Sequence, residues 1–108
     1  MSTDLAMPIR DPEGYLVDPD EWNEQVAEAI ASEIGITLTE DHWEAIRFMR
    51  SYYEDRRIAA DARFVIKRLE TLYPGEGRKR LFELFPYGYV GQACKVAGMK
   101  RPRAWSTG

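Results

Sequence analysis

Apolar side chains recur along most of this chain with the spacing of amphipathic helices. The pattern predicts five helical segments, at about 20–34, 39–53, 59–72, 78–85 and 89–97. Asp20 and Thr39 are predicted N-caps, because a side-chain oxygen there accepts a hydrogen bond from the first free N–H groups of a helix. Gly35, Pro86 and Gly98 are predicted to end helices, since glycine adopts the left-handed conformation and proline lacks an N–H donor.

The two ends of the chain lack this periodicity. Leu5, Met7 and Ile9 alternate with other residues, Asp11-Pro12-Glu13-Gly14 has turn composition, and Tyr15-Leu16-Val17 follows, which predicts an N-terminal β-hairpin. Residues 98–108 are basic and aperiodic, and we expect them to form a flexible arm. The predicted fold is mainly α: a single domain over 1–108 with about five helices, an N-terminal β-hairpin and a C-terminal arm.

Composition narrows the class of protein. The 108 residues are 44% hydrophobic and 31% charged, which is typical of one soluble domain with a modest core. No apolar run approaches the roughly 20 residues of a membrane span, and the N-terminus has no signal-peptide pattern. The sequence contains one cysteine and therefore has no intrachain disulfide, so we expect a cytoplasmic protein.

The net charge of −3 conceals an asymmetry along the chain. Residues 1–62 contain fifteen acidic residues and five arginines, a balance of −10, whereas residues 63–108 contain three glutamates and ten lysines or arginines, a balance of +7. Such a split is typical of a chain whose basic half meets nucleic acid or an acidic protein. It is equally typical of a solvated surface whose two halves attract each other.

The sequence has no motif for a metal ion or a phosphate-bearing cofactor. Metal sites need several His, Cys or carboxylate ligands at fixed spacing, and the one histidine and one cysteine lie 52 positions apart. We interpret His42 as a surface or capping residue in the first turn of its helix. No glycine-rich phosphate-binding motif occurs, so we expect neither a metal nor a cofactor.

Cys94 is the remaining candidate for chemistry. On helical spacing it joins Val90, Ala93 and Ala97 in one apolar stripe, which favours a small hydrophobic side chain in the core. Lys95 follows it directly, and further cations lie on the adjoining arm. Because nearby cations stabilise a thiolate, the same surroundings also favour a reactive thiol.

Several segments occur in the order and spacing of a known family. They are Glu13-Gly14-Tyr15-Leu16, Trp22, LTEDHWEAIRFMRSYY at 38–53, Ile58-Ala59, Arg63, Lys67, LFPYG at 84–88 and QACKVAG at 92–98. With these segments the chain resembles the DsrC/TusE family of small sulfur-relay proteins from about residue 11 to 103. The resemblance implies a compact orthogonal helical bundle, with a hairpin in front and an arm behind. It also implies a carrier of sulfur as a cysteine persulfide, without enzymatic turnover of its own.

The resemblance implies partners as well. They are a complex of small sulfurtransferases that serves tRNA thiolation, or sulfite reductase in dissimilatory sulfur metabolism. Family carriers place their essential cysteine on the arm, eleven positions beyond the one in QAC, and here that position is Trp105. The arm thiol is therefore missing, and Tyr89 and Gly91 stand where relatives commonly have Pro and Lys.

We therefore predict a monomeric sulfur-relay protein that acts by protein–protein transfer, with Cys94 as the persulfide-carrying thiol. Its predicted binding residues are cations and one arm aromatic: Arg63, Lys67, Lys95, Lys100, Arg101, Arg103 and Trp105. The alternative is a binding or regulatory homologue that has lost sulfur transfer. It would bind protein partners, or DNA through the helix-turn-helix-like segment at 59–85, whose cations are Arg63, Lys67, Arg68, Arg78, Lys79 and Arg80.

Overall fold

The computed structural model describes residues 7–100 of the chain. Their main helices are α1 (Glu24–Glu33), α2 (Glu40–Arg56), α3 (Ala62–Leu72), α4 (Gly77–Leu84) and α5 (Cys94–Val96). A short 3₁₀ helix, η1 (Pro19–Glu21), precedes α1, and a π-helical turn, η2 (Tyr89–Ala93), runs directly into α5. The predicted mainly helical fold is confirmed.

Three helices begin where a polar side chain caps them. The Asn23 side chain accepts a hydrogen bond from the Val26 N–H at 2.9 Å, and the Asp61 carboxylate accepts one from the Arg63 N–H at 2.8 Å. Thr39 begins α2 as predicted. The predicted start of the first helix at Asp20 is wrong, because Trp22 has extended backbone angles and separates η1 from α1. The third helix begins three residues later than predicted because Asp61 is its cap.

The predicted N-terminal hairpin is also wrong. Among residues 7–100 no strand forms, and Arg10 and Leu16 make one isolated antiparallel bridge. The Asp11 carboxylate accepts hydrogen bonds from the backbone N–H groups of Glu13 (2.9 Å) and Tyr15 (3.0 Å). A β-ladder would need these backbone N–H groups, but the Asp11 carboxylate already accepts their hydrogen bonds. Pro8 and Pro12 have no backbone N–H to donate to a ladder. A tight loop results, and Leu5 lies outside the described residues.

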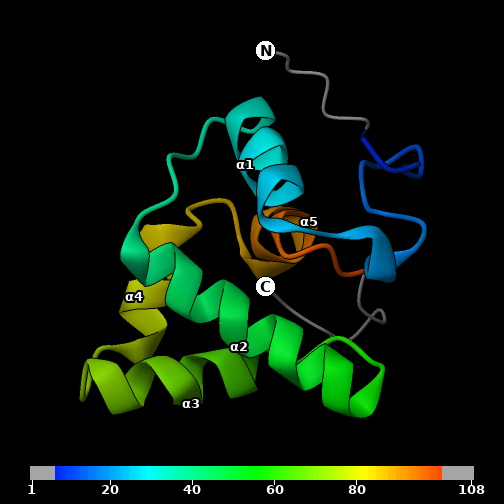
Figure 1. Ribbon diagram of the computed structural model, residues 1–108. Helices are drawn as coiled ribbons and strands as arrows, with labels where there is room; N and C mark the ends of the chain where they lie inside the picture. The colour runs from blue at the N-terminus through cyan, green and yellow to red at the C-terminus, as the bar shows by residue number, and fades with distance from the viewer. Residues whose placement is uncertain (1–6, 101–108) are drawn as a thin grey trace.

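One hydrophobic core joins these elements. Figure 1 shows η2 and α5 in the middle of the molecule beside α1, with α2, α3 and α4 around the opposite side. Helix α3 packs against α2 and α4, and α1 packs against α5. The largest fully buried side chains come from α1, α2, α3, η2 and α5, from the N-terminal loop, and from positions just after α4 and α5: Leu16, Val26, Ile30, Ile46, Met49, Val65, Leu69, Phe85, Tyr89, Cys94, Val96 and Met99.

His42 ties the start of α2 to the end of α4. Its Nε2–H donates to the Leu84 carbonyl at 2.8 Å, and its Nδ1 accepts the Thr39 N–H at 3.0 Å, which completes a capping box. The imidazole is 7% exposed and meets the Phe85 ring edge-on at 5.2 Å. The capping role expected for His42 is therefore confirmed, and it is not a surface residue.

Candidate functional site

The site is built around Cys94, which begins α5. Pro86 follows the end of α4, and Gly88, at φ 107°, turns the chain in a conformation that favours glycine. In the π-helical turn that follows, the Cys94 N–H donates to the carbonyl of Tyr89, five residues earlier. π-helical turns insert one extra residue into a helical ladder and are frequent at functional sites. The turn places the Cys94 side chain in the core.

The Cys94 thiol is sealed from solvent. The exposed fraction of the Cys94 side chain is 0%. Burial raises the pKa of the thiol to about 12, and the neighbouring Tyr89 side chain offsets part of this rise. A thiol with such a pKa is protonated at neutral pH, whereas the thiolate is the nucleophile. In this conformation Cys94 is therefore a core side chain, and it can attack another sulfur only after it becomes exposed.

Tyr89 is the polar neighbour of the thiol. Its ring is 1% exposed, and its hydroxyl donates a hydrogen bond to the Ala60 carbonyl in the α2–α3 connection. Burial is the main cause that raises the pKa of the Tyr89 hydroxyl far above its ordinary value of 10. The phenol is therefore neutral and keeps its single proton.

The C-terminal end of α5 is fixed by two side chains from distant segments. The Trp22 indole N–H donates to the Val96 carbonyl at 2.8 Å, and Arg50 donates to the Ala97 carbonyl at 3.1 Å. The Arg50 guanidinium also donates to the Pro19 carbonyl at 3.1 Å and lies 4.6 Å from the centre of the Trp22 ring. These bonds satisfy carbonyls that a helix end leaves free, and they determine where the chain leaves α5.

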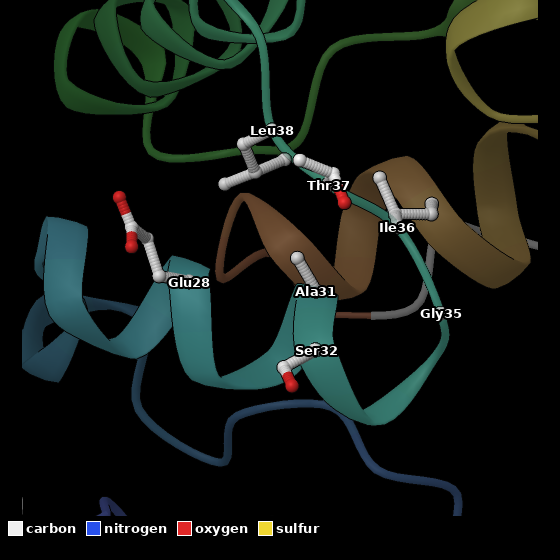
Figure 2. A pocket seen from close by; sticks show the side chains of 7 residues that line it. All are labelled: Glu28, Ala31, Ser32, Gly35, Ile36, Thr37 and Leu38. Carbon is white, nitrogen blue, oxygen red and sulfur yellow. The ribbon is translucent and has the colours of Figure 1, made fainter.

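A surface hollow of about 390 Å³ lies elsewhere, between the end of α1 and the α1–α2 connection. Figure 2 shows that Glu28, Ala31 and Ser32 line it from α1, and that Gly35, Ile36, Thr37 and Leu38 line it from the connection. Glu28 is its one charged lining residue, and Cys94 does not reach it. Over residues 7–100 no group of three His, Cys, Asp or Glu side chains is placed to hold a metal ion.

Comparison with known proteins identifies the family. A family model described as DsrC like protein matches residues 6–104. A sulfurtransferase TusE from Pectobacterium atrosepticum is 40% identical over 94 residues, which are 85% of this chain and 86% of that protein. This chain belongs to the DsrC-like family. Membership makes it a sulfur-relay protein of the DsrC/TusE type.

Solved structures of the family agree with the fold. The oxidized gamma subunit of dissimilatory sulfite reductase (DsrC) from Archaeoglobus fulgidus superposes with a TM-score of 0.83 at 34% identity, over 90% of both chains. DsrC from Allochromatium vinosum gives a TM-score of 0.76 at 39% identity, over 88% of this chain and 87% of that one. The bundle that surrounds Cys94 is therefore the bundle of these DsrC proteins.

The structure does not gather the predicted cations around the thiol. The Lys95 ammonium lies 5.2 Å from the centre of the Tyr15 ring, and no cation of the described segment contributes to the pKa of Cys94. Arg63 and Lys67 lie exposed on α3, and Lys100 is exposed after α5. Arg101, Arg103 and Trp105 lie outside the described residues.

The helix-turn-helix alternative finds little support on α3 and α4. Three of its cations are in ion pairs: Arg63 with Asp61 at 3.1 Å, Arg68 with Glu44 at 3.4 Å, and Arg80 with Asp41 at 3.2 Å. Their charge is partly neutralised before any phosphate arrives. The DsrC and TusE relatives favour sulfur relay over this alternative.

Sequence reasoning missed the residues that hold the site together. Arg50 falls on the inward face of α2 together with Ile46 and Met49. Because a buried charge needs a hydrogen-bond partner, an arginine on an apolar stripe indicates that such a partner lies in the core. No local pattern indicates that Trp22 and Arg50 reach Val96 and Ala97, because 74 and 47 residues separate the pairs.

Proposed function

We propose that this protein carries sulfur between partner proteins as a persulfide on Cys94. The observation that carries the proposal is the 34% identical DsrC fold, at a TM-score of 0.83, built around the only cysteine of the sequence. Every covalent role of sulfur in this chain has to use that thiol.

The transfer is a thiol–persulfide exchange. The Cys94 thiolate attacks the outer sulfur of a donor persulfide, the sulfur–sulfur bond of the donor breaks, and the donor leaves as a thiolate. One sulfur–sulfur bond forms and one breaks, so no external oxidant or reductant is consumed. Because the sequence has no second cysteine, an acceptor thiolate on another protein has to take the sulfur.

Transfer requires that Cys94 first become exposed. In the described conformation the thiol has 0% exposure and a pKa of about 12, so the reactive species is a locally opened form. Local opening of a short element takes less free energy than global unfolding. The α5 segment is such an element, because it is a single turn that Trp22 and Arg50 hold at one end.

The expected partners are proteins of the sulfur relay. A small sulfurtransferase complex is the proposed donor, and sulfite reductase or the tRNA-thiolation system is the proposed destination. The basic balance of residues 63–108 suits an acidic partner surface, since complementary charge speeds association. We propose that the protein acts as a monomer in the cytoplasm. No helix within residues 7–100 is long and apolar enough to cross a membrane.

Persulfide loading tests the proposal directly. The protein is incubated with a persulfide-loaded small sulfurtransferase, and its intact mass is measured without reductant. We expect a gain of one sulfur atom, lost on reduction with dithiothreitol, in the native protein and no gain in Cys94→Ser. A DsrC relative that has the additional arm cysteine serves as the positive control for the donor.

A native protein that stays unloaded while the relative loads would contradict sulfur transfer by this chain. The remaining function would then be that of a docking protein in the relay. In that case Cys94→Ser would bind the sulfurtransferase with unchanged affinity.

A further inference from the structure

The chain reverses after α5 in a Schellman motif that closes on Cys94. Gly98, at φ 76°, has the left-handed conformation that this motif requires just after a helix. Its N–H donates to the Lys95 carbonyl at 3.1 Å, and the Met99 N–H donates to the Cys94 carbonyl at 2.9 Å. The motif frequently includes an apolar contact between the residues that its longer bond joins. Here those residues are Cys94 and Met99, and both are 0% exposed.

Two side chains from distant segments complete this cap. A helix end leaves four carbonyls without a donor from the helix itself, and the Schellman motif supplies donors for the first two. The Trp22 indole N–H and the Arg50 guanidinium supply the other two, at the Val96 and Ala97 carbonyls. Every carbonyl of residues 94–97 therefore accepts a hydrogen bond, and the last two depend on Trp22 and Arg50.

Arg50 depends on this contact in turn. The residue is 8% exposed, and its guanidinium lies 4.6 Å from the centre of the Trp22 ring and 5.4 Å from that of the Tyr53 ring. Its Nε–H has no hydrogen-bond partner within residues 7–100. The guanidinium donates to the Pro19 and Ala97 carbonyls. Because a buried charge is costly unless hydrogen bonds compensate it, Arg50 and the end of α5 hold each other in place.

The segment that closes over Cys94 is short. Lys100, directly after Met99, is exposed, so the chain returns to the surface within one residue of the cap. Movement of residues 97–99 breaks the few hydrogen bonds of the cap and leaves α1, which packs against α5, where it is. Local openings of this kind need less free energy than global unfolding.

We propose that the C-terminal cap of α5 is the cover that opens to expose Cys94. In this cover Trp22 and Arg50 are positioning residues, which act on the thiol through the Val96 and Ala97 carbonyls. Release of the cap draws the chain after Ala97 away from Cys94 and lets solvent reach the sulfur. The consequence for sulfur transfer rests on the proposed function, whereas the cover itself is tested on the protein alone.

The first test uses the unaltered protein. Hydrogen exchange of single amides, followed by NMR, and the rate of Cys94 alkylation by iodoacetamide each give a free energy of opening. We expect the Met99 amide and the Cys94 thiol to give the same value, with little dependence on urea. This value should lie well below the one from the Ile46 amide on α2.

Two results of this test would overturn the proposal, whether or not any variant folds. One is a Cys94 value that equals the Ile46 value with the same urea dependence, because the thiol would then be exposed only by global unfolding. The other is a Met99 amide that opens far more readily than Cys94, because the cap would then open without exposing the thiol.

The second test removes one donor of the cap. Trp22→Phe loses the indole N–H that Val96 accepts but keeps the Cβ, Cγ and Cδ1 atoms nearest to Gly98. Loss of one hydrogen bond is expected to speed Cys94 alkylation roughly two- to ten-fold. Trp43→Phe is the matched control, because it removes the same atoms from a half-buried tryptophan on α2 and should label at the native rate. An unchanged rate in Trp22→Phe, or equal acceleration in both variants, would contradict the role of Trp22.

Arg50→Met removes the other side-chain donor and keeps an unbranched apolar stem. We expect Cys94 alkylation and exchange of the Met99 amide to become faster by the same factor, again roughly two- to ten-fold. A change in global stability alone would not couple these two rates. A folded Arg50→Met protein that labels at the native rate would overturn the role of Arg50.

The outcomes separate this proposal from sulfur transfer. If Met99 and Cys94 open together but the protein accepts no sulfur from the loaded sulfurtransferase, the cover stands and the proposed function fails. If the protein accepts sulfur while Cys94 is exposed only by global unfolding, the function stands and the cover fails.

Discussion

At the scale of single residues, burial determines what each titratable group can do. Cys94 and His42 both lie in the core, and burial favours the neutral form of each: it raises the pKa of the Cys94 thiol and lowers the pKa of the His42 imidazole. For Cys94 the result is a protected nucleophile. For His42 it is a neutral ring that accepts from Thr39 and donates to Leu84.

The His42 environment predicts a loss of stability in mild acid. Burial lowers the folded-state pKa below the ordinary 6.5, although the bond to Leu84 and the charge of Asp41 oppose this shift. The unfolded chain therefore binds more protons, and the free energy of unfolding decreases as the pH falls below about 6.5. The contribution of one histidine is at most about 1.4 kcal/mol per pH unit.

Urea denaturation at several pH values between 7.5 and 5 measures this effect. His42→Gln is the control, because glutamine at this position keeps a capping box and does not titrate. We expect a flatter pH dependence for the variant. Parallel curves for the two proteins would show that His42 is not the group responsible.

At the scale of elements, the ends of the helices carry most of the specific interactions. Gly98, at φ 76°, ends α5 directly beneath Trp22, and a Cβ atom added there would lie 2.4 Å from the indole ring. The absence of a side chain lets Trp22 reach the Val96 carbonyl. The chain therefore leaves α5 at a place that both backbone conformation and close packing require.

Gly98→Ala is expected to be markedly destabilising. The left-handed conformation costs an alanine about 1–2 kcal/mol, and the overlap with Trp22 adds about 1–3 kcal/mol. Gly35→Ala is the matched control, since Gly35 has φ 80° and nothing lies within 4 Å of an added Cβ. The difference between the two free energies of unfolding, from urea titration, isolates the Trp22 contact. Equal losses would mean that the indole moves aside freely.

At the scale of the whole molecule, the two oppositely charged halves of the sequence are partly joined by ion pairs within one bundle. Arg80 of the basic half meets Asp41 of the acidic half, and Arg68 likewise meets Glu44. The surface of α3 and α4 therefore has less uncompensated positive charge than the number of lysines and arginines in these helices would give. A net charge of −3 adds a repulsion from phosphate at long range.

We expect no measurable binding to duplex DNA at 0.15 M salt. Non-specific DNA binding is driven by neutralised phosphates, and this surface offers few uncompensated cations. Fluorescence anisotropy of a labelled duplex, titrated with protein from low to physiological salt, is the measurement. Saturable binding with a steep salt dependence would revive the DNA-binding alternative. Arg78→Glu would then identify the surface by weakening it.

Much of the fold could be predicted because helical signals are local. Thr39, Gly35, Pro86 and Gly98 mark helix boundaries through their own backbone and capping chemistry, and all four lie at or next to observed helix ends. The same reasoning failed at the N-terminus, where it predicted a hairpin that does not form. Alternation was present, but the Asp11 carboxylate took the N–H groups that a second strand would have used.

Neighbouring residues and covalent composition are enough to specify the helical elements, the family and the presence of a single thiol. The protonation and exposure of that thiol depend instead on packing between distant segments. Its exposure depends on how α1 and α5 pack, and on Tyr89, whose carbonyl accepts the Cys94 N–H and whose hydroxyl donates to Ala60 in another segment. The Lys95 ammonium lies over Tyr15 and adds nothing to the pKa of Cys94. The solvent exposure of a side chain and the groups that it contacts depend on residues distant along the chain, so no local sequence pattern predicts them.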